Sequence, residues 1–159
     1  MVEEKPHLTL DFGILLGLAY QGFTDSLRAA LAEKGYDDLG GAYGYVFRAL
    51  AEDEPSQREL ARRLVITDQG MAKIISEMVE RGYVQRHPDP EDSRVNRLRL
   101  GQRGRAALTA ARQFHAAFER RLQKEVGAEA VRKLRHLLMT IGAHGVEPSS
   151  AHARLRPIA

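Results

Sequence analysis

The sequence lacks cysteine, long apolar runs and a large excess of charge of either sign. Without cysteine the chain cannot hold a disulfide framework, a cysteine-ligated zinc site, a thiol nucleophile or a thiol redox switch. Lys and Arg total 24 against 21 Asp and Glu, a formal net charge of +3, so where the charges lie matters more than their sum. The best apolar run, residues 12–20, is far shorter than the ~20 residues of a membrane span.

These absences favour an ordinary cytoplasmic protein. A chain of 159 residues is long enough for one domain with a substantial core and too short for two comfortable ones. Its acidic opening does not have the pattern of a secretory leader. We therefore expect a single globular domain over residues 1–159, located in the cytoplasm, with no membrane partner.

Motifs for catalysis, metal binding and cofactor binding are missing as well. There is no HExxH, no pair of histidines four residues apart, no phosphate-binding glycine loop and no Gly-x-Ser-x-Gly elbow. Histidines and carboxylates can form a zinc site without cysteine, but their spacing here gives that no support. We expect no enzymatic activity, no cofactor and no metal.

Helical periodicity covers both ends of the chain. Apolar residues recur every three or four positions over residues 8–34, where Gly13, Gly17 and Gly22 suggest close packing against other helices. The same spacing predicts a short helix near residues 43–50, a long helix after Gly104 and a last helix over residues 128–145. Residues 147–159 contain Pro, Ser and Arg, and we expect a flexible tail there.

Two short helices joined by a three-residue turn are predicted in the middle of the chain. Ser56 and Glu59 have the form of a capping box that opens a helix ending near Leu64. Thr67 is the natural N-cap of the next helix, which Gly82 ends. That helix has a polar front and a predicted buried back of Met71, Ile74, Ile75, Met78 and Val79.

A basic β-hairpin follows. Residues 83–87 are β-prone, residues 88–93 are turn material and residues 96–100 alternate polar with apolar, so we expect Leu98 and Leu100 inward and Arg97 and Arg99 outward. Seven arginines lie between residues 81 and 105: Arg81, Arg86, Arg94, Arg97, Arg99, Arg103 and Arg105.

Helix, turn, helix and basic hairpin together describe a winged helix-turn-helix. A recognition helix needs an apolar back to dock and a slender polar first turn to meet base edges in the major groove. The alternatives are an arginine-rich hairpin that is only a solvated surface, and a helix pair that is only an all-helical corner. We predict a mainly α (α+β) fold, with a winged helix-turn-helix lobe over residues 42–105 and flanking helices.

Three segments, residues 57–64, 70–86 and 90–94, resemble the MarR family of winged helix-turn-helix transcriptional regulators. Two departures are Ser93, where the family commonly has arginine, and Gly101, where it often has threonine. The resemblance implies a homodimer joined by the helices over residues 8–34 and 128–145. It also implies a sequence-specific regulator of double-stranded DNA, bound at a pseudo-palindromic operator. It further implies a repressor that a small aromatic or phenolic ligand releases from DNA.

The same resemblance assigns candidate site residues. Arg94 would enter the minor groove at the wing tip, and Asp92 would hold it or a neighbouring arginine in place. The full set of candidate DNA contacts is Ser56, Thr67, Asp68, Gln69, Gly70, Lys73, Arg86, Asp92, Arg94 and Arg97. Candidate ligand contacts are Tyr20, Phe23, Tyr43, Phe47 and Arg48, for which ordinary core packing is the competing interpretation.

A second functional class stays open. Winged helices also serve as protein-interaction or RNA-binding modules with no ligand response, and a fold alone does not decide between these functions. RNA-binding surfaces usually expose aromatic side chains for stacking, and the predicted wing offers only Tyr83, which we expect to be buried.

Overall fold

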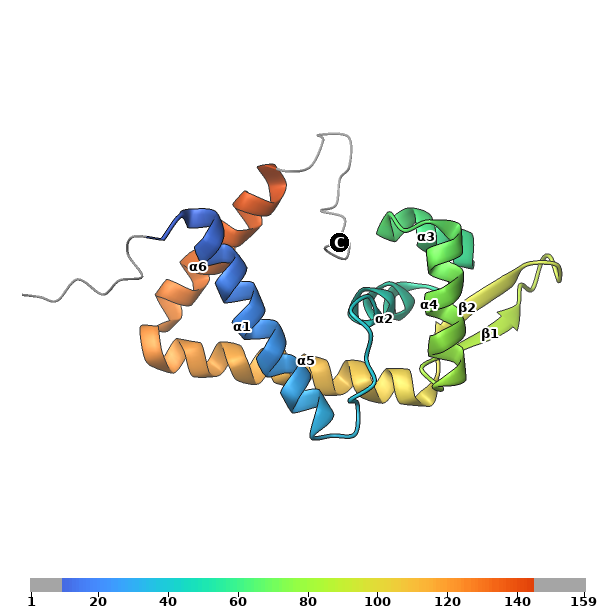
Figure 1. Cartoon of the computed structure of the whole chain (residues 1–159), viewed down its shortest axis with the longest axis horizontal. Coiled ribbons are helices and arrows are strands. Elements are labelled where there is room, and N and C mark those ends of the chain that lie inside the picture. The colour runs from blue at the N-terminus through green and yellow to red at the C-terminus, as the bar shows by residue number, and fades with distance from the viewer. Residues whose placement is uncertain (1–9, 145–159) are drawn as a thin grey trace, which may run out of the picture. The chain divides into compact units, whose positions relative to one another are not determined.

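The computed structural model describes residues 10–144, which form six helices and one two-stranded antiparallel sheet (Figure 1). They divide into two compact units, one ending at Asp38 and the other beginning at Leu39. The predicted tail over residues 147–159 lies outside the described residues, as do positions 8, 9 and 145 of the two predicted end helices. Within residues 10–144, no helix combines the length and the hydropathy needed to cross a membrane.

The first unit contains α1 (Phe12–Ala32). The predicted helix over residues 8–34 is therefore too long, because Leu10 and Asp11 are not helical and the chain turns at Gly35 with a φ of +84°. The glycines of α1 are not sites of close contact within the described chain, since a Cβ at Gly13, Gly17 or Gly22 would meet nothing within 4 Å. Most of the apolar side chains in the first half of α1 are exposed.

The second unit begins with three helices, α2 (Tyr43–Glu52), α3 (Gln57–Leu64) and α4 (Asp68–Glu80). The predicted capping box is present: the Ser56 hydroxyl accepts from the backbone N–H of Glu59, and the Glu59 carboxylate accepts from the backbone N–H of Ser56. Thr67 caps α4 as predicted, because its hydroxyl accepts from the N–H of Gly70 at 3.1 Å. These local signals set the starts of both helices of the helix-turn-helix.

The hairpin consists of β1 (Val84–Pro88) and β2 (Asn96–Leu100), with Val84 opposite Leu100 and His87 opposite Arg97. It begins one residue later than predicted, because Gly82 has a φ of +76° and Tyr83 belongs to the turn. Leu98 and Leu100 are buried as expected, and β2 contacts α2, α3 and α5. Beyond the strands, the N–H of Leu98 donates to the carbonyl of Pro55, which ties the hairpin to the corner before α3.

Two aromatic rings from α2 and one from the turn before β1 form the centre of the second unit's core. Tyr43, Phe47 and Tyr83 are almost completely buried, with ring centroids 5.6–6.3 Å apart. The chain after β2 comes so close to this turn that a Cβ at Gly104 would lie 2.1 Å from the carbonyl oxygen of Tyr83. Glycine is therefore required where α5 begins.

The long helix α5 (Gln102–Val126) ends at Gly127, whose φ is +89°, and α6 (Ala128–His144) packs against it. Val131 is buried, and Arg135 on α6 donates to the Glu119 carboxylate on α5 at 2.8 Å. Four further apolar residues of α6 have helical spacing and remain exposed: Leu134, Leu137, Leu138 and Ile141.

Candidate nucleic-acid interface

The front of α4 is polar and exposed, and its back is buried. Met71, Ile75 and Met78 are fully buried, which anchors the helix against its own lobe. Ile74 and Val79 are only half-buried, so the predicted buried face is narrower than expected. The candidate base-reading residues Thr67, Asp68, Gln69 and Lys73 are exposed, and Gly70 is half-buried.

Two polar residues at the start of the helix-turn-helix already have structural partners. The Ser56 hydroxyl, a candidate DNA contact, belongs to the capping box of α3. The Nε of Arg58 lies 3.9 Å from the Asp68 carboxylate, and both side chains are largely exposed. Such an exposed pair is worth at most about 1 kcal/mol, so DNA phosphates can compete for Arg58.

Arg97 lies on the strand face opposite the buried Leu98, as expected, but two carboxylates hold it and leave its side chain only one-third exposed. Its Nε donates to Asp89 across the hairpin turn, and its Nη1 donates to Glu59 on α3 at 2.9 Å. The hydrogen bond from Arg97 holds the pKa of Asp89 below its usual range. The backbone N–H of Ser56, followed by the Ser56 hydroxyl, lowers the pKa of Glu59. Arg97 therefore fastens the wing to α3.

The wing tip is organised by two aspartates. Asp89 accepts from the backbone N–H groups of Glu91 and Asp92, and Asp92 accepts from the backbone N–H of Arg94 at 3.0 Å. Of these two aspartates, Asp89 is the one that binds an arginine side chain, whereas Asp92 fixes the backbone of Arg94. The Arg94 side chain itself is exposed.

Arg86 stands where the wing meets both helices of the motif. Its Nη2 lies 3.4 Å from Gln57 Oε1 and 3.4 Å from Ser76 Oγ, so it bridges β1, α3 and α4 while staying exposed. Both contacts are long for hydrogen bonds, and a DNA contact by Arg86 stays a prediction.

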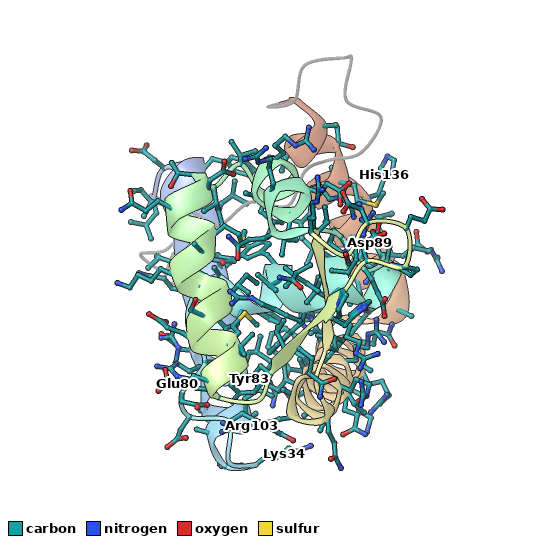
Figure 2. All side chains as sticks on the ribbon, turned by 90° about the vertical axis from the view of Figure 1, so that its right-hand side faces the viewer. Lys34, Glu80, Tyr83, Asp89, Arg103 and His136 are labelled. Carbon is teal, nitrogen blue, oxygen red and sulfur yellow. The ribbon has the colours of Figure 1, made fainter. Side chains whose placement is uncertain are left out.

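The arginines at the base of the wing have structural roles. Arg103 lies over the Tyr83 ring, 4.4 Å from its centroid, and donates to the carbonyl of Arg81 at 3.0 Å. Figure 2 shows Tyr83 and Arg103 together at this base and Asp89 at the other end of the hairpin. Arg81 donates to the Tyr43 hydroxyl, and Arg105 donates to the carbonyl of Leu100. Much of the arginine cluster thus stabilises the lobe itself.

Sequence reasoning missed Glu59 and Asp89 as the residues that position the wing. From the sequence, Glu59 is expected only in the capping box of α3, and Asp89 lies in the turn material of residues 88–93 with no role of its own. A signal for Asp89 exists in the sequence, because an aspartate at the first position of a turn commonly accepts from backbone N–H groups two and three residues on. The Glu59–Arg97 contact spans 38 positions and has no local signal.

The candidate ligand residues are divided between the two units. Tyr43 and Phe47 are buried core residues, which agrees with the packing interpretation, and Arg48 is exposed on α2. Tyr20 and Phe23 belong to the other unit, on α1. Burial, together with the charge of Arg48, lowers the pKa of His115 on α5.

Comparison with known proteins finds similarity to the MarR family. The MarR family model matches residues 37–95, which include the helix-turn-helix and most of the wing. ExpG of Rhizobium meliloti, a transcriptional activator of exopolysaccharide II synthesis, is 31% identical over 104 residues, covering 65% of this chain and 54% of ExpG. The chain spans about half the length of the curated relatives it matches.

Solved structures agree on the fold. The transcriptional repressor CouR, bound to a 23-mer DNA duplex, aligns with a TM-score of 0.68 and 27% identity, covering 87% of this chain and 98% of CouR. A mutant of MarR from E. coli, complexed with operator DNA, aligns with a TM-score of 0.63 and 23% identity, covering 81% of this chain and 91% of that one. Family model, relatives and fold agree: residues 37–95 of this chain match the MarR family, and the chain has the fold of winged helix-turn-helix proteins of that family.

Proposed function

We propose that the chain is a sequence-specific DNA-binding transcriptional regulator. One observation carries the proposal: the exposed polar first turn of α4 lies on a helix with a buried apolar back, beside a hairpin fastened to the same lobe. Such a turn fits the major groove, where residues such as Gln69 can meet base edges. Arg94 suits a narrow minor groove. ExpG and CouR are both transcription regulators, which agrees with the expectation that this chain is not an enzyme.

Selecting binding sites from random double-stranded DNA tests this function. We expect an enriched two-fold symmetric sequence with half-sites about 34–36 Å apart, and an affinity that falls steeply with salt. Enrichment of single-stranded RNA in a parallel selection, with no DNA enrichment, would favour the RNA-binding alternative. A regulator of this kind works where the DNA is, so we propose a cytoplasmic location.

The proposed regulator acts as a homodimer. The exposed stripe of Leu134, Leu138 and Ile141 on α6, with further exposed apolar residues on α1, leaves apolar surface that a second copy would cover. Sedimentation of the full chain should give a dimer at micromolar concentration, and Leu138→Glu should give monomers. A monomeric wild-type chain would contradict the proposal.

We propose repression as the outcome of operator binding. A dimer bound to a promoter excludes other proteins from that DNA. This is the simplest way in which a DNA-binding lobe can regulate transcription. A promoter carrying the selected site should become more active when the regulator is absent. Because ExpG is an activator, the opposite result has a precedent among the relatives and would reverse the sign of the regulation.

A small aromatic acid is the proposed release signal, with exposed Arg48 as the partner of its carboxylate. A ligand shifts an equilibrium only by its difference in affinity for two states, typically a factor of about 5–150 between coupled sites. Salicylate should weaken DNA binding, and operator DNA should weaken salicylate binding by the same factor. Equal salicylate affinity with and without DNA would exclude release by this compound, and an unchanged affinity in Arg48→Ala would remove only Arg48.

A further inference from the structure

His87 lies on β1 between two hydrogen-bond acceptors. Its Nδ1 is 3.2 Å from the carbonyl oxygen of Pro88, and its Nε2 is 2.9 Å from the Oε2 of Glu54, in the loop between α2 and α3. The Nε2 atom is shielded from solvent. It lies within ion-pair distance of Glu54, but the angle is not that of a hydrogen bond, so among the described residues it has no hydrogen-bonded partner.

Two acceptors around one imidazole make the contact depend on the proton count. A neutral imidazole carries one N–H, so one of its nitrogens presents a lone pair to an acceptor oxygen. Only the imidazolium carries N–H groups toward both Pro88 and Glu54. The attraction between β1 and the α2–α3 loop at this point is therefore strongest for the doubly protonated ring, which places a positive charge beside the Glu54 carboxylate.

The other charges around His87 are already paired. Arg97, opposite it on β2, is bound by Asp89 from the turn and by Glu59 from α3. Asp53, next to Glu54, makes a two-pronged contact with Arg63. Successive side chains of a strand point to opposite faces, and α4 meets β1 on the other face, where Arg86 contacts Ser76. The charged side chains of α4 therefore lie away from the ring.

We propose that His87 is a positioning residue for DNA binding, a proton-dependent latch that fastens the wing to the α2–α3 loop through Glu54. Arg97 and the Leu98–Pro55 hydrogen bond hold the wing at all ordinary pH values. Protonation of His87 adds a further attraction between the wing and the α2–α3 loop, through Glu54. A fastened wing loses less freedom on binding, so protonation strengthens DNA binding. The effect on affinity rests on the proposed function, whereas the latch itself does not.

The latch can be measured without DNA. The amide of Leu98 joins the wing to Pro55, so its hydrogen-exchange protection, corrected for intrinsic rates, reports how often the two separate. Protection in the wild-type chain should be several-fold higher at about pH 5.5 than at about pH 8, because a lower pH favours the imidazolium that strengthens the contact with Glu54. His87→Gln and Glu54→Gln should abolish this difference, and the control His136→Gln, on α6, should keep it. A difference that persists in Glu54→Gln would overturn the latch.

Affinity for the selected operator is the second arm. From about pH 8 to about pH 5.5 we expect about five- to tenfold tighter binding by wild type and His136→Gln, and less than about twofold by His87→Gln and Glu54→Gln. If Glu54→Gln keeps the full pH dependence while His87→Gln loses it, His87 acts as a simple cation toward phosphate and the latch is wrong. If no variant binds DNA at any pH, the proposed function fails and the exchange measurement still decides the latch.

Discussion

Replacing Gly104 by alanine should destabilise the second unit. The added Cβ would lie 2.1 Å from the carbonyl oxygen of Tyr83 and 3.3 Å from Leu100 Cδ2, so the start of α5 must move away from the base of the wing. Overpacking of this kind costs about 1–3 kcal/mol, and contact with backbone favours the upper end. Alanine returns up to about 1 kcal/mol through helix propensity. The net loss is about 2 kcal/mol, or roughly 4–8 °C in Tm for a chain of this size.

Gly44→Ala is the matched control. Gly44 lies in α2 of the same unit, and a Cβ there would meet nothing within 4 Å, so only the helix-propensity gain remains. Thermal and urea unfolding should show Gly44→Ala at or above wild-type stability and Gly104→Ala below it. If Gly104→Ala is as stable as wild type, the close approach of α5 to Tyr83 is not present in solution.

Three further outcomes concern single side chains. Val65 follows the last residue of α3 with a φ of +56° and is largely exposed. Val65→Gly should relieve left-handed backbone strain of about 1–2 kcal/mol, while the greater freedom of glycine in the unfolded chain costs about 0.5–1 kcal/mol. The midpoint of urea unfolding should therefore rise. The hydrogen bond from Arg97 lowers the pKa of Asp89 in the folded chain. The Asp89 carboxylate therefore stabilises the fold at pH values above its pKa in the unfolded chain, and this stabilisation is lost as the pH falls through its lower pKa in the folded chain. Asp89→Asn should flatten the acid side of the curve of stability against pH. Burial lowers the pKa of His115, so on acidification its imidazole is protonated in the unfolded chain before it is protonated in the folded one. The stability of the wild-type chain should therefore fall as the pH drops below about 6.5. Melting curves at about pH 7.5 and about pH 5 should show a smaller loss of stability in His115→Gln.

The helix starts of the DNA-binding lobe were predictable because their signals are local. Ser56 with Glu59, and Thr67 with Gly70, satisfy backbone N–H groups within one turn, so neighbouring residues alone specify them. The hairpin was predictable within one residue for a similar reason, since alternation brings Leu98 and Leu100 to the buried face.

The fastening of the wing could not be predicted in this way. Arg97 has the same alternating context as Arg99, yet Arg97 binds Asp89 and Glu59, whereas Arg99 donates to Gln85 on the neighbouring strand. Only the folded arrangement of α3 against β2 separates the two. The start of α1 at Phe12 differs from the prediction, because Leu10 and Asp11 lie within the predicted helix and are not helical.

The most direct test of base reading by α4 and of charge contact by the wing is a selection of DNA sites from random sequence. It is carried out with the wild-type chain, with Gln69→Ala and with Arg94→Ala. Gln69→Ala should change the preferred base at one position of each half-site, with discrimination lowered by about 1–3 kcal/mol. Arg94→Ala should weaken all sites about equally and reduce the dependence of affinity on salt. Unchanged site preference in Gln69→Ala, together with unchanged affinity in Arg94→Ala at moderate salt, would contradict the assignment of both surfaces.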